Sequence, residues 1–381
     1  MDLPDRRPRL PALTSLRFFA AFHVVMFHLH ALHIFEGRGL YHQIASIGYV
    51  GVSLFFVLSG FILVYTYAGR SWTKGEFWRA RFARVYPAYL FSLVLTAPPF
   101  FYVCIKLKDM DIPFFAWFKA HLVLSATLVP LLLQAWWPMA ALAWNAPAWS
   151  LSVEAFFYAA FPFLVARLLR ARAQAMPRIL AASWLVSLAL SGGYWLLRPD
   201  GLAHTDDVLL NVFWLNALKF NPLARLPEFV MGMALGFLFL RGAVDRKWAT
   251  PLLLGGIAVS LAIVMGSGHI PYPILHDSAL APAFAAIIYG LALRPSWIGF
   301  LEIKALVLLG DASYTLYLLH NFVLGAYFSP FGTLRHLTPL GIAIGIVLPI
   351  VISLVVYRLI EVPARNWLRP KKATPVQVMA E

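Results

Sequence analysis

The sequence has 381 residues, of which 61% are hydrophobic and 13% are charged. Soluble domains carry about 25% charged residues, so this composition excludes a soluble globular protein and indicates a chain embedded in a bilayer. The formal net charge is +14, but membrane proteins accumulate basic residues in cytoplasmic loops, and no separate basic domain or RNA-binding pattern accompanies them. The single cysteine, Cys104, excludes an intrachain disulfide and a cysteine-rich metal site.

A helix needs about 20 consecutive, mainly apolar residues to cross a bilayer. Such segments lie near 14–34, 45–68, 85–105, 150–169, 179–197, 225–241, 250–266, 278–293, 304–328 and 339–361. The first segment follows three arginines, but it is too long for a signal peptide and lacks a clear cleavage site, so we expect it to be retained as a span. The sequence therefore predicts an all-α integral membrane protein with about ten transmembrane helices.

The apolar segment 114–138 is ambiguous because it contains a lysine, a histidine and two prolines. If it is re-entrant or interfacial rather than spanning, Lys and Arg concentrate on the side of the two termini in every successive pair of loops. A crossing here would reverse all later loops, so both termini are predicted to be cytoplasmic. We expect residues 1–381 to form a single membrane-embedded domain, with short cytoplasmic tails at 1–13 and 362–381.

Two ionisable residues of the first span, Arg17 and His28, have ten residues between them. A helix turns about 100° and rises about 1.5 Å per residue, so both side chains lie on one face, about 16 Å apart along the axis. An ionisable residue within a membrane span is costly and is by default a candidate functional residue. The alternative is that Arg17 extends to the membrane interface and His28 hydrogen-bonds to a neighbouring helix.

Polar residues near the third and fourth spans fit two kinds of ligand. Arg81 and Arg84 face the same way on a helical turn at the cytoplasmic surface, where they could bind the phosphate of a nucleotide-bearing donor. The alternative is that they are ordinary basic residues of a cytoplasmic loop. Glu154 is expected about one turn below the outer surface with Ser150 and Ser152, where these groups can hydrogen-bond hydroxyls of an acceptor. Glu154 also fits a first-turn acid stabilised by the helix dipole.

The ninth span places Tyr317 and His320 on one helix face. At about 1.5 Å per residue from the cytoplasmic end, His320 and His28 both reach the outer half of the membrane, near the expected level of Glu154. Polar groups from three helices at one depth favour a buried polar site over three separate packing roles.

A metal site is not expected in the first span. His23 and His30 project roughly opposite to His28, so these histidines do not converge on one ion. The sequence also lacks a Walker A, Rossmann or G-x-S-x-G pattern in a suitable context.

Six motifs follow one another along the chain: Arg17 with His28, G-V-S-L-F-F-V-L-S-G at 51–60, Arg81 and Arg84 before Tyr86-Pro87, W-S-L-S-V-E-A-F-F-Y at 149–158, S-Y-T-L-Y-L-L-H at 313–320 and E-V-P-A-R at 361–365. With these motifs the chain resembles the acyltransferase-3 family of bacterial integral membrane acyltransferases. The resemblance implies a ten-helix domain that transfers an acyl group, usually acetyl from cytoplasmic acetyl-CoA, to a hydroxyl of a glycan or another acceptor. It implies a catalytic role for His28, donor or structural roles for Arg17, Arg81 and Arg84, and a site role for Glu154.

We therefore expect a multi-pass O-acyltransferase of the bacterial cytoplasmic (inner) membrane that modifies a polysaccharide or glycolipid at the outer side. His28 is expected to act as general base or to carry the acyl group, with Glu154 as the second catalytic residue. Acyl-CoA is expected at Arg17, Arg81 and Arg84, and the glycan or lipid-linked sugar acceptor at Ser150, Ser152, Tyr317 and His320. No metal and no nucleic acid are expected. Transfer is either direct or completed by a separate extracytoplasmic partner, because this sequence shows no SGNH-type domain.

The competing hypothesis is a proton-coupled transporter or flippase, since such carriers also use intramembrane His and Glu residues. The chain lacks paired interrupted helices in matching positions of two halves, which transporters of that kind often have. A non-enzymatic subunit of a glycan export machine would leave the arginine and histidine pattern unexplained.

Loop charge generates a labelling prediction. With Cys104 replaced, cysteines introduced at Arg172 and Lys372 should resist a membrane-impermeant thiol reagent in intact cells, whereas a cysteine at Asp206 should react. The first two positions lie on the basic, cytoplasmic side and the third on the outer side. Labelling of position 172 from outside would overturn the ten-span topology.

Overall fold

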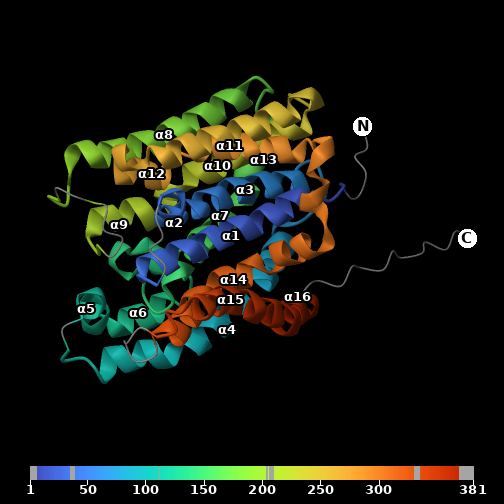
Figure 1. Ribbon diagram of the computed structural model, residues 1–381. Coiled ribbons are helices and arrows are strands. Elements are labelled where there is room, and N and C mark those ends of the chain that lie inside the picture. Colours follow the sequence, from blue (N-terminus) through green and yellow to red (C-terminus); the bar gives the residue numbers. More distant parts are fainter. Residues whose placement is uncertain are drawn as a thin grey trace, which may run out of the picture.

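The computed structural model describes residues 7–34, 39–110, 112–202, 205, 210–329 and 335–368. Within these residues every regular element is helical (Figure 1). The long helices run side by side, the start of α1 and helix α16 lie at one end of the bundle, and α5, α6 and α9 lie at the other (Figure 1). Asp206 and Lys372, proposed above for labelling, lie outside the described residues.

The longer helices are α1 (Pro11–Ala31), α3 (Gly51–Tyr67), α4 (Lys74–Ile105), α7 (Trp149–Arg170), α8 (Ala175–Leu197), α10 (Pro222–Leu240), α11 (Ala249–Met265), α13 (Ala281–Ala292), α14 (Lys304–Phe328) and α15 (Pro339–Val356). The short ones are α2 (Leu40–Ser46), α5 (Pro113–Ala120), α6 (Leu122–Leu128), α9 (Phe213–Phe220), α12 (Tyr272–Asp277) and α16 (Val362–Leu368). A π-helical turn, Tyr357–Glu361, joins α15 to α16.

In the described part of the chain, nine helical segments are long and apolar enough to cross a membrane. The 25-residue helix α14 packs against α1 and α15 and is the remaining long helix of the bundle. Its hydropathy is lowered by polar residues that include Asp311, Ser313 and His320. The predicted all-α membrane fold is confirmed; α14 is not among these nine segments, so its role as a tenth span stays a prediction.

The ambiguous region near 114–138 forms two short helices, α5 and α6, followed by 3₁₀ turns rather than one spanning helix. Segment 129–148 is folded into the bundle, where Gln134 and Asn145 are buried. The Asn145 side-chain amide donates to the Leu318 carbonyl of α14 at 3.1 Å, and that of Gln134 donates to the Ala148 carbonyl at 3.1 Å. These bonds satisfy buried groups that irregular backbone would otherwise leave unpaired.

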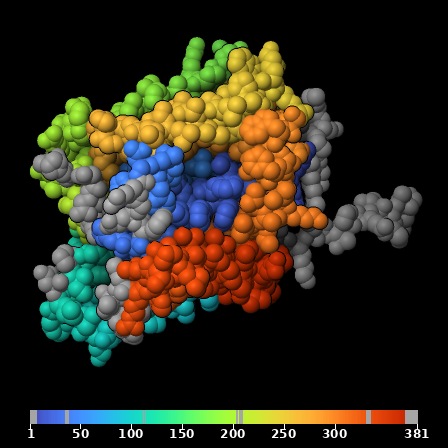
Figure 2. Space-filling view, in the orientation of Figure 1, coloured from blue at the N-terminus to red at the C-terminus, as the bar shows by residue number. Residues whose placement is uncertain are grey.

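Helices α3 and α10 approach each other through glycines. A Cβ atom added to Gly232 would lie 1.9 Å from the Val57 carbonyl oxygen, and one added to Gly60 would lie 2.2 Å from the Phe229 carbonyl oxygen. Small residues allow this backbone contact between membrane helices. Helix α1 (blue) is visible at the floor of a hollow between α11 and α15 in Figure 2, so it is central without being enclosed on every side.

Gly232→Ala should therefore destabilise the protein, because overpacking a tight contact costs about 1–3 kcal/mol. Gly193→Ala in α8 is the matched control, since nothing lies within 4 Å of its added Cβ. Thermal unfolding in one detergent should give a lower midpoint for Gly232→Ala alone. Equal midpoints for the two variants would contradict the close α3–α10 contact.

Candidate active site

A cavity of about 320 Å³, here called the central cavity, lies among α1, α3, α4, α7 and α14. Its polar lining consists of Thr14, Arg17, Ser59, Thr66, Arg81, Arg84, Ser150, Glu154, Tyr158, Asp311, Ser313, Tyr314 and Tyr317. Phe55 and Phe56 contribute apolar walls. Six of the residues singled out in the sequence thus meet around one space: Arg17, Arg81, Arg84, Ser150, Glu154 and Tyr317.

The arginines are surrounded by carboxylates from several helices. Arg84 interacts electrostatically with Glu361, Glu154 and Asp311, and Arg17 interacts with Glu154 and Glu361. Because charges removed from water must be paired, these carboxylates are what allow two guanidinium groups inside the bundle. The carboxylates therefore offset part of the positive charge of the arginines before any ligand binds.

Arg81 is held differently, by aromatic rings. Its guanidinium donates a hydrogen bond to the Tyr67 hydroxyl at 3.3 Å and lies 5.8 Å from the ring centroid of Tyr158. Its Nε atom has no hydrogen-bond partner although it is buried. Arg81 thus keeps a donor that a ligand in the central cavity can use.

Glu154 lines the central cavity together with the three arginines. It accepts a short hydrogen bond from the Tyr158 hydroxyl, one helical turn further along α7. Segment 129–148 packs over the first turn of α7, the helix on which Glu154 lies. Ser152 shows this packing, because its hydroxyl donates to the Leu132 carbonyl at 2.6 Å and accepts from the Ala135 amide at 3.3 Å.

Ser150 and Tyr317 close one end of the central cavity. The Tyr317 hydroxyl donates to the Pro147 carbonyl at 2.8 Å, and the Ser150 hydroxyl donates to the Tyr317 oxygen at 3.0 Å. All three hydroxyls donate within the protein, but Ser150 and Tyr317 line the cavity whereas Ser152 does not. Ser150 and Tyr317 are thus the predicted substrate-binding hydroxyls that face the open space.

His28 and His320 form a direct pair between α1 and α14. The Nε2 atom of His320 lies 3.2 Å from Nδ1 of His28, and Nδ1 of His320 lies 2.8 Å from the Tyr317 carbonyl oxygen. A carbonyl only accepts, so Nδ1 of His320 carries the proton and its Nε2 is the acceptor. Nδ1 of His28 also lies 2.9 Å from the Val24 carbonyl oxygen, so it carries a proton that Val24 and His320 share, and Nε2 of neutral His28 is left unprotonated.

The two histidines differ in accessibility. His320 is completely buried, whereas His28 retains exposed surface. His28 does not line the central cavity; Tyr317 does, and its ring centroid lies 6.0 Å from that of His320. Tyr317 thus connects the lining of the central cavity to the histidine pair, and His28 is the less buried member of that pair.

Glu361 is a site residue that the sequence analysis did not select. It is buried, and its carboxylate accepts a hydrogen bond from the Thr315 hydroxyl at 2.7 Å. The π-helical turn Tyr357–Glu361 places it there, and such turns often occur at functional sites. The E-V-P-A-R motif at the end of the last span could have pointed to Glu361, because a carboxylate buried there needs a cation as its partner.

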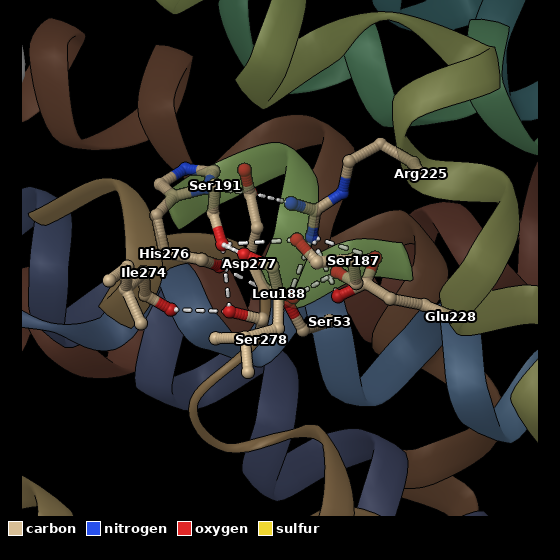
Figure 3. Close-up of polar contacts among 10 residues, drawn as sticks. All are labelled: Ser53, Ser187, Leu188, Ser191, Arg225, Glu228, Ile274, His276, Asp277 and Ser278. Atoms are coloured by element: carbon tan, nitrogen blue, oxygen red, sulfur yellow. Dashed lines mark hydrogen bonds and ion pairs between the residues drawn. The ribbon is translucent and has the colours of Figure 1, made fainter. Parts of the chain in front are cut away.

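A second buried polar cluster, here called the ion-pair network, links α3, α10 and α12 (Figure 3). Arg225 donates to Glu228 at 3.0 Å and to the Ser53 hydroxyl at 2.8 Å, and it forms an ion pair with Asp277. The Arg225 guanidinium also lies 5.4 Å from the ring centroid of Phe56, which lines the central cavity. The ion-pair network thus contacts Phe56, a wall residue of the central cavity.

The comparisons with known proteins identify the family of the chain. Residues 10–358 match the model of a family described as "Acyltransferase domain". The chain belongs to this acyltransferase family. The predicted family resemblance is therefore confirmed, and the protein is a multi-pass membrane acyltransferase. No solved structure matches it.

Two similar proteins cover most of the chain. The acyltransferase MdmB of Streptomyces mycarofaciens is 29% identical over 336 residues, which are 84% of this chain and 81% of MdmB. The O-acetyltransferase OatA of Staphylococcus aureus is 26% identical over 94% of this chain, but the match spans only 57% of OatA. A shorter match, 36% identical over 109 residues, is to protein 2 in the picA locus of Rhizobium radiobacter, and it covers 28% of this chain and 52% of that protein.

Proposed function

We propose that this acyltransferase moves an acetyl group from cytoplasmic acetyl-CoA to a hydroxyl of a glycan or lipid-linked sugar at the outer side of the bacterial inner membrane. The observation that carries the proposal is the pairing of two polar centres, the arginines of the central cavity and the His28–His320 pair behind Tyr317. Similarity to an O-acetyltransferase supports acetyl as the group and oxygen as the acceptor atom. The basic loops support cytoplasmic termini.

The arginines form the donor side of this proposal. Arg17 and His28 share one face of α1, about 16 Å apart along the helix. A thioester arm that follows this face runs from the arginines past Tyr317 to His28. Phe55 and Phe56 narrow the central cavity, whose volume of about 320 Å³ suits a short acyl group.

The chemistry follows from the tautomer of His28. Its Nε2 accepts the proton of the acceptor hydroxyl while the hydroxyl oxygen attacks the thioester carbonyl carbon. The new C–O bond forms, the C–S bond breaks, and the proton passes from His28 to the departing sulfur. In a two-step variant, Nε2 first attacks the thioester carbonyl carbon and the C–S bond breaks to release the thiolate. The hydroxyl oxygen then attacks the acyl-histidine, the C–N bond breaks, and the hydroxyl proton passes to the thiolate. Both routes return His28 to its neutral state.

The other polar residues support these steps. His320 accepts from Nδ1 of His28 and so orients its ring as a positioning residue. Glu154 balances Arg17 and Arg84 and holds Tyr158, while Ser150 and Tyr317 offer hydroxyls to the substrate. The transporter hypothesis is not favoured, because the chain belongs to an acyltransferase family.

His28→Ala should abolish acetyl transfer, since loss of a general base costs about 10²–10⁴-fold in rate. His23→Ala is the control: the Nε2 atom of His23 lies 2.7 Å from the Ile44 carbonyl oxygen, away from the histidine pair. Transfer from radiolabelled acetyl-CoA to a panel of lipid-linked glycans is measured on purified protein in lipid. A folded His28→Ala protein that acetylates at a near-normal rate would move the chemistry elsewhere. Label trapped on wild-type protein by rapid quenching, without acceptor, would identify the two-step route.

His320→Leu removes one of the two acceptors for Nδ1 of His28 and leaves the Val24 carbonyl at 2.9 Å, so it should lower kcat by about tenfold with little change in KM for acetyl-CoA. His320→Gln should recover part of this loss, because its amide oxygen can accept the same hydrogen bond. The kcat values of the two variants are compared at matched thermal stability. Equal losses in both would assign His320 to packing rather than to positioning.

A further inference from the structure

A second cavity lies beside the central cavity, and we call it the basic vestibule. Its volume is about 640 Å³. Its charged lining consists of Arg7, Arg9, Arg70, Lys304 and Arg365, with Glu302 and Asp311 as the only carboxylates among its lining residues. It lies at the end of the bundle that holds the start of α1 and helix α16 (Figure 1). The predicted topology puts this end in the cytoplasm.

The basic vestibule adjoins the central cavity directly. Thr14, Ile62, Thr66 and Asp311 line both spaces. A ligand held in the vestibule can therefore extend a thin arm past these residues toward Arg17. From Thr14 to His28 the helix rises about 21 Å, so only a long donor reaches from the vestibule to the histidine pair.

The cations lining the vestibule outnumber the carboxylates beside them, although Arg365 pairs with Glu361 at 3.9 Å and Arg7 donates to the Val64 and Ala68 carbonyls. Glu302 is already bound by Arg294 through hydrogen bonds of 2.9 and 2.6 Å. Burial and the neighbouring Arg70 guanidinium both lower the pKa of Arg7, as expected for like charges held together. Buried nitrogens of Arg70 (Nε and Nη2) and Arg365 (Nε) have no hydrogen-bond partner. Guanidinium donors gathered in this way favour a multiply charged phosphate ligand.

The arginines of the central cavity are less suited to that ligand. Arg84 already faces Glu361, Glu154 and Asp311, and these carboxylates would repel a diphosphate. The contrast in charge between the two cavities separates a site for phosphate groups from a site for the uncharged arm and its thioester.

We infer that the basic vestibule binds the phosphate groups at the nucleotide end of a coenzyme A thioester, while Arg17, Arg81 and Arg84 contact its arm. This inference rests on the proposed function and specifies where its donor is recognised. The phosphate of an anionic lipid shares this chemistry, but a lipid places two apolar chains next to its phosphate, whereas the vestibule continues into a polar cavity. The nucleotide end of the thioester therefore fits the basic vestibule better than a lipid does.

The test measures equilibrium binding to protein in phosphatidylcholine nanodiscs, with coenzyme A, dephospho-coenzyme A and adenosine 3′,5′-bisphosphate as probes. Wild-type protein should bind coenzyme A more tightly than the dephospho form, and the bisphosphate should compete. Arg70→Gln and Lys304→Gln should each weaken coenzyme A binding about tenfold and reduce the preference for the 3′-phosphate. Lys247→Gln is the matched control, because Lys247 is 71% exposed, pairs with Asp245 at 3.3 Å and lies outside the vestibule.

Competition between the bisphosphate and coenzyme A is measured on wild-type protein. It therefore tests phosphate binding in the vestibule even if Arg70→Gln is unstable. Coenzyme A that binds without competition, and equally to the vestibule variants, would overturn the inference and leave the proposed function standing. Wild-type protein that binds no coenzyme A at all would overturn the proposed function itself. Loss of bisphosphate binding when phosphatidylglycerol is added at constant ionic strength would assign the vestibule to lipid instead.

Discussion

Arg17 and Arg84 can lie inside a membrane bundle only because carboxylates from other helices compensate their charge. Removing an ion from water costs several kcal/mol even after relaxation, so an uncompensated guanidinium would not stay in this position. The compensating groups, Glu154, Asp311 and Glu361, come from α7, α14 and the turn before α16. Charge compensation therefore holds helices from both ends of the chain around the central cavity. It also explains why α14 carries Asp311 within an otherwise largely apolar helix.

The spans and much of the site could be predicted from the sequence for definite physical reasons. Backbone groups in a bilayer must be satisfied internally, so long apolar helices are the main solution and hydropathy locates them. Helical spacing then relates residues on one helix, such as Arg17 and His28. It does not relate residues on different helices. For His28 and His320 the sequence predicted only a similar depth, whereas the structure shows a contact of 3.2 Å between their ring nitrogens.

Other features depend on how irregular segments fold, which spacing does not encode. The 3₁₀ turns of segment 129–148 cover the start of α7, the helix on which Glu154 lies. Glu361 owes its position to a π-helical turn at the end of an otherwise regular span. Arg225 stands at the start of an apolar helix, where a loop cation is expected, yet it is 1% exposed and bound to Glu228 and Asp277. The positions of Glu154, Glu361 and Arg225 each depend on residues from a distant part of the chain.

The neutral histidine pair has an energetic consequence for a reaction that joins two compartments. Under the proposed mechanism, an acyl group travels outward and the proton of the acceptor hydroxyl travels inward on the sulfur of coenzyme A. His28 begins and ends each cycle neutral, and neither compartment gains or loses charge. A membrane potential shifts the energy of each transported charge by about 2.3 kcal/mol per 100 mV, but here there is no net charge for it to act on. The driving force is then the difference between thioester and ester, and transfer would proceed equally well across an energised or a depolarised membrane.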